Sequence, residues 1–560
     1  MSRLPALALR LAVPFGAAAA ALIGVLPGLH AEKPAKVVAE AKVDEAPATY
    51  YVGVSSCAEC HERGGAQKNG GPAVVCTCTE ATTWLCKDKH QDAFKVLDPK
   101  TNPRAKRMAE LLGYDPRQEP KCLSCHSTPG VNEEKKSDPP YGESFRMDDG
   151  VGCVSCHGAF DKWLDMHGGV MRAKWRKNSR EEKQDKYGMT DLWDPARRVE
   201  VCGSCHVGSR EENKVVTHLM YAAGHPPLPS FEVGAFCDMM PRHWQLLAEK
   251  SDPARGLLQV KDGELEQTKL VVVGAAASFR QAMTLLAADA AAAAKEDGAV
   301  DFAQMDCAAC HHDLKQPSWR QARGYAGRPG RPGLRDWPLA LLSVTFPLAG
   351  DDPKFHADFE EKLKALYKAF DDRPYGDPKE VAAAAESLAT WAKDLGGLLN
   401  DDKVHYDRRA ALEVLRRLAA LPADRAPDYD TARQIAWAFR VVYGEVYHEF
   451  QKAKDDEGAK TFATLEKSKD QVKASLDALA KTLDLDLSPA DNDVAVAALP
   501  DDDAARKEKL TEYAKARQTL YDAYVPDVLD KTRDYKPDDF QKAFAEMAKL
   551  LPASPSEPRP

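Results

Sequence analysis

Residues 150–158 of the chain read Gly-Val-Gly-Cys-Val-Ser-Cys-His-Gly, and Cys153 to His157 at the centre of this stretch form the motif C-x-x-C-H. The chain carries the motif five times, and we number the copies 1 to 5 in chain order. A composition of 14 cysteines and 15 histidines in 560 residues gives about 0.01 copies by chance, so the repetition needs a chemical reason. The other four copies are Cys57–His61, Cys122–His126, Cys202–His206 and Cys307–His311.

The motif suits covalent attachment of haem. Two thiols add across the haem vinyl groups, and the adjacent histidine reaches the iron. Zinc ribbons and redox dithiols also contain C-x-x-C, but zinc sites do not need a histidine after each second cysteine, and a thioredoxin-like motif needs a βαβ pattern. The sequence therefore predicts five covalent haems of the c type. The predicted attachment residues are Cys57, Cys60, Cys122, Cys125, Cys153, Cys156, Cys202, Cys205, Cys307 and Cys310, and the predicted proximal iron ligands are His61, His126, His157, His206 and His311.

The five motifs lie within residues 51–340, which we predict to be a pentahaem cytochrome c domain. Each haem then has a little under about 60 residues of chain, a length at which an independent domain is marginal. We therefore expect the haems to pack against one another and to serve as the core, close enough to exchange electrons.

Six further histidines lie among the motifs. A second imidazole on the distal side of the iron gives a low-spin electron carrier, so these histidines are candidate distal ligands. His312 directly follows a proximal ligand, so we expect it to point away from that haem and to act as a hydrogen-bond or propionate partner. The six candidates are His90, His167, His218, His225, His243 and His312.

Four stretches carry a resemblance to a known family. They are Trp84-Leu-Cys-Lys-Asp-Lys-His90-Gln-Asp-Ala-Phe94, Gly150 to Gly158 followed by His167, Thr217-His218-Leu-Met-Tyr-Ala-Ala-Gly224-His225-Pro226-Pro227, and Asp306-Cys-Ala-Ala-Cys-His311-His312-Asp-Leu314. In these stretches, over about half of its length, the chain resembles the cytochrome c554 family of multihaem c-type cytochromes. The resemblance implies that His90, His167, His218 and His225 are distal ligands of haems whose motifs lie elsewhere. His243 is the fifth distal candidate.

The family pattern has four haems, one of which lacks a strong sixth ligand, whereas this chain has five motifs. Which haem is open, if any, therefore does not transfer from the family. The resemblance also extends to exported relatives with a long helical C-terminal extension.

The N-terminus has the features of an export signal. A basic start precedes an apolar stretch over residues 11–26, and Ala31 supplies a small residue at a cleavage point. Residues 1–31 are predicted to be a signal peptide and residues 32–50 a linker. The alternative is a retained membrane anchor, because Leu29 departs from the usual A-x-A pattern. We expect a periplasmic or otherwise exported protein, in a compartment where haem c is attached.

Four cysteines lie outside the motifs. In an exported protein they are expected to form at least one disulfide, although Cys76 and Cys78 are the least suitable pair because a single residue separates them. The alternative is a metal site formed by Cys76, Cys78, Cys86 and His90, which would withdraw His90 from the haem. The four residues are Cys76, Cys78, Cys86 and Cys237.

Residues 341–551 contain no cysteine and show helical periodicity, as in Phe359, Leu363, Leu366 and Phe370. We predict an antiparallel helical bundle there and a disordered tail at residues 552–560. The predicted fold class is therefore mainly α, with a multihaem domain that contains little sheet followed by the bundle.

The composition is otherwise that of an ordinary globular protein. Apolar residues make up 44% and charged residues 29%, which excludes a fully disordered, collagen-like or polytopic membrane chain. The net charge of -9 gives no general reason to bind nucleic acid or anionic lipid. We expect redox partner proteins, no nucleic acid, and membrane contact only if the N-terminal segment is retained.

Two main functions remain open on the sequence, and a third, an assembly subunit whose C-terminal bundle docks other proteins while its haems connect them, differs from the first only in its partner. The first is electron transfer between redox partners through mostly bis-histidine haems. The second is oxidation or reduction of a small nitrogen or sulfur compound at one five-coordinate haem. The chain lacks the C-x-x-C-K motif of pentahaem nitrite reductases, and hydroxylamine oxidoreductases carry eight haems, so neither of these enzyme classes fits.

Overall fold

The computed structural model describes residues 51–62, 76–128, 142–159, 163–168, 171–323, 331–350, 352–371, 373–423, 428–486, 499–500, 502–512 and 528–553. The predicted signal peptide 1–31, the linker 32–50 and most of the predicted tail 552–560 lie outside these residues. Within them the fold is mainly α, as predicted, and contains no strand, only two isolated bridges.

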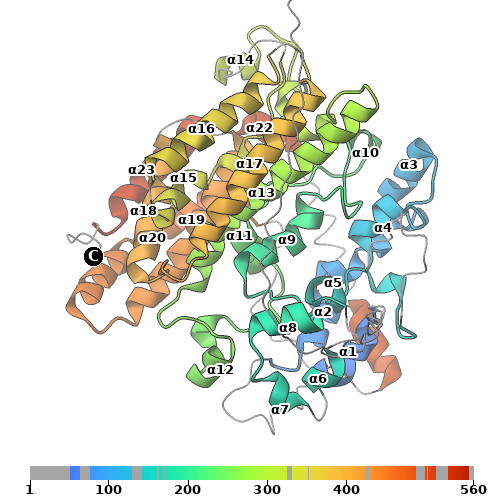
Figure 1. The fold of residues 1–560 in the computed structure, drawn as a ribbon, viewed down its shortest axis with the longest axis vertical. Helices are drawn as coiled ribbons and strands as arrows, with labels where there is room; N and C mark the ends of the chain where they lie inside the picture. The colour runs from blue at the N-terminus through green and yellow to red at the C-terminus, as the bar shows by residue number, and fades with distance from the viewer. Residues whose placement is uncertain are drawn as a thin grey trace, which may run out of the picture. The chain divides into compact units, whose positions relative to one another are not determined.

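Short helices form the part of the chain that carries the motifs (Figure 1). The helices are α1 Val54–His61, α2 Glu80–Lys87, α3 Pro103–Leu112, α4 Pro120–His126, α5 Cys153–His157, α6 Leu164–Gly168, α7 Arg172–Trp175, α8 Arg180–Tyr187, α9 Pro195–His206, α10 His218–Ala223, α11 Val233–Met239 and α12 Asp252–Leu257. Among α1 to α10 the buried apolar side chains form small clusters, such as that of Val52, Val154 and Trp163.

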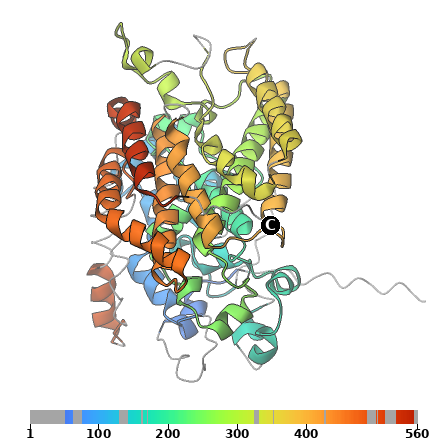
Figure 2. The ribbon, with the colours of Figure 1, turned by 90° about the vertical axis from the view of Figure 1, so that its left-hand side faces the viewer.

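Most helices in the rest of the chain are long, and those of residues 353–483 run beside one another in the views of Figure 1 and Figure 2. Short connections, such as that between α19 and α20, make chain neighbours antiparallel. The helices are α13 Glu266–Lys295, α14 Trp319–Arg323, α15 Leu342–Thr345, α16 Pro353–Lys368, α17 Pro378–Leu399, α18 Arg408–Ala420, α19 Tyr429–Gln451, α20 Asp456–Leu483, α22 Val528–Asp534 and α23 Pro537–Leu550. The 3-10 helices are η2 Lys89–Asp92, η3 Lys95–Leu97, η4 Met147–Asp149, η5 Leu247–Glu249, η6 Phe302–Gln304, η7 Cys307–Ala309, η8 Trp337–Leu339, η9 Phe346–Ala349 and η10 Leu421–Ala423.

Aspartates fix where the long helices begin. In each of α16 to α20 the residue before the first turn is an aspartate whose carboxylate accepts a backbone N–H of that turn. Such a cap contributes about 0.5–2 kcal/mol by satisfying a donor that has no partner within the helix. The capping residues are Asp352, Asp377, Asp407, Asp428 and Asp455.

Helix α13 is the centre of the large apolar core. Its sequence position puts it between motifs 4 and 5, yet its main packing partner is α17 of the C-terminal bundle. In length and composition α13 matches a membrane span, but 78% of its apolar window is buried against the rest of the protein. It is therefore accounted for as a core helix, and one cluster of buried side chains extends from Ala235 to Leu551.

Helix α11 joins this core to the motif region. Phe236 on α11 lies edge-on to Trp437 of α19, with ring centres 5.8 Å apart. The side-chain amide of Gln434 donates a hydrogen bond to the backbone oxygen of Phe231, at 2.7 Å. The bundle therefore packs directly against the segment that follows His225.

Candidate haem sites

The motifs occupy the last turns of short helices. A helix places residues i, i+3 and i+4 on one face, so both cysteines and the histidine of a motif point the same way. Motif 5 departs from this pattern, because its cysteines lie in and just after η7. The helices α1, α4, α5 and α9 end at His61, His126, His157 and His206, respectively.

Four motif histidines each face a second histidine from a distant part of the chain. With metal–nitrogen bonds of about 2.0–2.1 Å, two imidazoles on opposite sides of one metal ion have ring centres roughly 6.3 Å apart. The observed separations fit an iron between the rings of each pair. They are 6.0 Å for His61 and His167, 6.2 Å for His90 and His206, 6.4 Å for His126 and His225, and 6.2 Å for His218 and His311.

Hydrogen bonds at Nδ1 orient four of these rings. His61 and His90 bond the carboxylates of Glu80 and Asp88, at 2.8 and 2.9 Å. The Nδ1 atoms of His126 and His225 each lie 2.7 Å from a backbone oxygen, that of Ala93 or Pro226. A histidine that donates from Nδ1 presents Nε2 to a metal, which is the usual arrangement of metal-binding histidines.

Burial keeps several of the rings neutral, which is the form that binds iron. It lowers the pKa of His206 and of His225 to about 4. For His61 the hydrogen bond to Glu80 has the larger effect and raises the pKa. Burial lowers the pKa of His90, but the nearby Asp88 carboxylate outweighs this and leaves a net rise.

The loop that carries His90 packs against motif 3. The indole N–H of Trp84 donates to the backbone oxygen of Val151, and the N–H of Val151 donates to the oxygen of His90. Gly150 has φ +69°, and a Cβ atom there would lie 2.6 Å from the His90 oxygen. Only glycine fits at this position, so the glycine before motif 3 helps to place the His90 ring.

Motif 3 is different. Burial, followed by the charge of His243, lowers the pKa of His157 to about 4, so His243 lies in its neighbourhood. Among the residues that the structure describes, however, no histidine ring faces His157 at the spacing of the other pairs. The Nδ1 atom of His243 is buried without a hydrogen-bond partner. His312 bonds the oxygen of Asp313 through Nδ1 and faces Trp319.

Cysteines of different motifs lie close to each other. The thiols of Cys57 in motif 1 and Cys153 in motif 3 lie close enough to shift each other's pKa, and so do those of Cys125 in motif 2 and Cys205 in motif 4. Because these sulfurs are the expected attachment points, groups attached at motifs 1 and 3, and at motifs 2 and 4, would lie near each other.

Side chains that the sequence did not single out complete the sites. Phe231 lies parallel to the His206 ring, with centres 5.8 Å apart, and Phe236 lies edge-on to it at 5.1 Å. Arg104 lies close enough to His225 for its charge to lower the pKa of that ring, and its Nη1 atom is buried without a partner. A buried guanidinium nitrogen without a partner would suit a propionate group of a haem held by His225. Neither hydrophobic periodicity nor the spacing of the motifs identifies Phe231, Phe236 or Arg104 as neighbours of the histidine rings.

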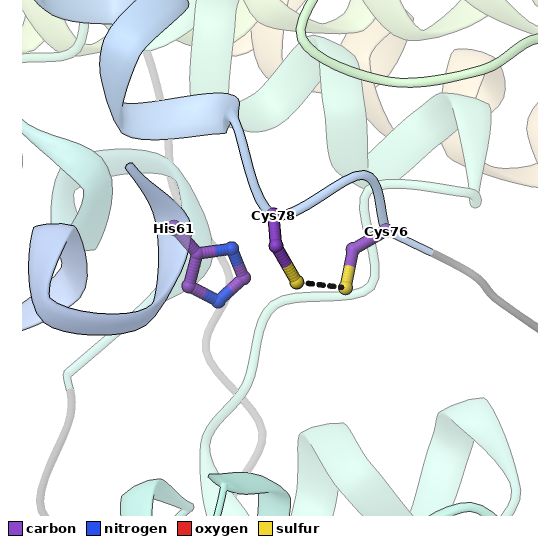
Figure 3. Close-up of side chains that lie close together, drawn as sticks. All are labelled: His61, Cys76 and Cys78. Carbon is purple, nitrogen blue, oxygen red and sulfur yellow. Dashed lines mark hydrogen bonds between the residues drawn. The ribbon is translucent and has the colours of Figure 1, made fainter. Parts of the chain in front are cut away.

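The cysteines outside the motifs are free thiols, as are all 14 in the chain, so the expected disulfide is not formed in the structure. The proposed metal site that included His90 is not formed either, because His90 faces His206. Instead, Cys76 and Cys78 lie beside His61, with their Sγ atoms 3.6 Å apart (Figure 3).

Comparison with known proteins agrees with this chemistry. A family model described as cytochrome c554 and c-prime matches residues 56–158, a span that contains motifs 1 to 3. No curated protein and no solved structure matches the chain. Covalently bound haem c and a role in electron transfer follow from this match. Residues 56–158 thus belong to the cytochrome c554-like family of multihaem c-type cytochromes.

Proposed function

We propose that the protein is an exported pentahaem c-type cytochrome that carries electrons between redox partner proteins through closely packed haems, most of them held by two histidines. The observation that carries the proposal is the set of four facing histidine pairs. Two filled axial positions suit a carrier, because a closed iron changes its charge without binding a substrate. The proposed axial pairs are His61 with His167, His126 with His225, His206 with His90, and His311 with His218.

The residues around the rings make the sites unequal. When bound, each haem supplies a one-electron Fe(III)/Fe(II) couple. At His61 and His90 a carboxylate accepts the Nδ1 hydrogen bond, which makes the imidazole a stronger electron donor. At His126 and His225 the acceptors are neutral carbonyl oxygens. We expect the first arrangement to favour the ferric form and the second to favour the ferrous form.

The proximity of motif cysteines supports short electron paths. The thiols of motifs 1 and 3, and those of motifs 2 and 4, lie close enough to shift each other's pKa, which brings the attachment points of each group near one another. This differs from a chain in which each haem has its own protein core.

The first experiment separates haem attachment from axial ligation. Haem quantification with intact mass of the purified protein is expected to give five covalent haems per chain. In His225→Ala all five stay attached, because attachment depends on the cysteines, while one haem changes from low to high spin and binds carbon monoxide. His405→Ala, at an exposed position in the bundle, is the control and leaves the spectrum unchanged.

Two results would contradict the proposal. A different haem count would refute five attachment sites. An unchanged spin state in His225→Ala would show that this ring does not bind iron.

A second candidate function rests on motif 3. Since no described histidine ring faces His157 at the spacing of the other pairs, a haem attached there can keep an open position for a small nitrogen or sulfur compound. The test is addition of carbon monoxide or nitric oxide to the unmodified reduced protein. Binding of one equivalent that persists in His243→Ala supports an open site, and no binding supports a pure carrier.

A further inference from the structure

We propose that Cys76 and Cys78 form a reversible dithiol–disulfide couple that exchanges two electrons with haem iron bound at motif 1. The inference rests on the proposed function, because it requires a haem held by His61. It assigns a redox role to two of the four cysteines that haem attachment does not use.

The two sulfurs are placed for bond formation. Their Sγ atoms lie 3.6 Å apart, and both lie within 4.8 Å of a ring nitrogen of His61 (Figure 3). Cys78 has a left-handed backbone, with φ +58°, which is uncommon for a residue other than glycine. This turn brings the side chains of Cys76 and Cys78 to the same side of the loop. A disulfide between them is therefore feasible although only one residue separates them in the sequence.

Glu80 ties this cysteine loop to the axial histidine. Its Oε1 atom accepts the backbone N–H of Thr77 at 2.6 Å and that of Cys78 at 3.1 Å. Its other oxygen, Oε2, lies 2.8 Å from Nδ1 of His61. One carboxylate therefore holds the loop and orients the ring, so the conformation of the cysteines and the environment of the iron ligand are mechanically linked.

The surroundings favour a redox pair over a metal site. His61 uses Nδ1 for Glu80 and needs Nε2 for iron, so it has no nitrogen left for a second metal. Cys78 is buried, while Cys76 is partly exposed and opens the pair to water. Cys86 and Cys237 are both buried, and neither belongs to this cluster, so Cys76 and Cys78 are each other's partner.

The thiols of Cys76 and Cys78 lose two protons to solvent and two electrons, and one S–S bond forms. The electrons are taken up one each by two ferric haem irons, which become ferrous. Cys57 and Cys153 lie close to each other, so the attachment sites of motifs 1 and 3 are neighbours. Haems attached at these two motifs would be the two one-electron acceptors. The reverse step reopens the disulfide.

The test uses the full ferric holoprotein under argon. Intact mass and peptide mapping first establish that haem is attached at Cys57 and Cys60, so a failure of the proposed function is recognised before the thiols are studied. The protein is then treated with one equivalent of a phosphine per chain, which reduces one disulfide, and the phosphine is removed. Ferrous haem is followed by its α-band absorbance, and thiols are counted by alkylation and mass spectrometry of the peptide that contains Cys76 and Cys78.

The unmodified protein is expected to gain up to two equivalents of ferrous haem while Cys76 and Cys78 become resistant to alkylation. Cys76→Ser and Cys78→Ser are both expected to lose the response, and Cys86→Ser is expected to keep it. Cys76→Ser changes a partly exposed side chain, so it can be used for the test if Cys78→Ser, at the buried position, does not fold. Thiols that stay alkylatable beside ferric haem, or equal ferrous signals in all variants, would overturn the proposal. A metal bound in proportion to the chain and lost in Cys76→Ser would also overturn it.

Discussion

Replacing Trp437 by alanine tests whether the C-terminal bundle supports the site at motif 4. The Trp437 side chain is 0% exposed, and its indole N–H donates to the backbone oxygen of Leu485 at 2.8 Å. Truncating such a buried tryptophan costs about 3–5 kcal/mol. Trp437→Phe keeps a ring but leaves the Leu485 oxygen unpaired, which costs about 1–3 kcal/mol. We expect the free energy of unfolding to fall in that order.

Trp437→Ala is also expected to change the environment of the haem iron at motif 4. Phe236 contacts both Trp437 and the His206 ring, at 5.8 and 5.1 Å, so removing the indole frees the side chain that borders the ligand. Guanidinium unfolding followed by circular dichroism measures stability, and electron paramagnetic resonance of the ferric protein detects a shift in one low-spin haem signal. Trp437→Phe is expected to give a smaller shift.

A matched control separates destabilisation from this contact. Leu465 is also 0% exposed but lies on α20, which packs against α19 and α23. Leu465→Ala is expected to lose about 2–5 kcal/mol without any change in the haem signals. Identical haem spectra in Trp437→Ala and Leu465→Ala would refute the reasoning, as would a loss of stability below about 1 kcal/mol in Trp437→Ala.

Two further predictions concern the bundle. Burial raises the pKa of Glu445 to about 7, so its protonated form contributes stability below its ordinary pKa of 4.5 that is lost as the pH rises through 7. Glu445→Gln should therefore make the fall in stability between pH 5 and pH 8 shallower, by up to about 3 kcal/mol in unfolding titrations; an unchanged slope would contradict this. Gly376 has φ +81°, and a Cβ there would lie 2.8 Å from Phe370 and Val381, so Gly376→Ala should lower the unfolding midpoint; an unchanged midpoint would show that the turn relaxes.

The sequence was sufficient for the chemistry of the motifs but not for the pairing of the rings. The C-x-x-C-H spacing is local, and a helical turn brings its three side chains to one face. The relative position of the His90 and His206 rings depends instead on long-range packing, such as that of Trp84 against Val151. Periodicity in a single sequence contains no information on such contacts.

One local interpretation was changed by the structure. Cys76 and Cys78 looked unsuited to each other on spacing alone, and the left-handed turn at Cys78 is a backbone feature that spacing does not reveal. The position of α13 in the chain likewise did not indicate that it packs mainly against α17.

The proposed histidine pairs would also crosslink distant parts of the chain through iron. Iron in each proposed pair would close a loop of about a hundred residues, and a crosslink around such a loop limits the unfolded chain by an amount of order 4–5 kcal/mol. The loops 61–167, 90–206, 126–225 and 218–311 overlap in succession, so a cut anywhere from 61 to 311 separates at least one pair. As the ribosome makes the chain, no pair is complete before residue 167, when three motifs are already present. If the four pairs bind iron as proposed, none of these sites can be excised as an independent module.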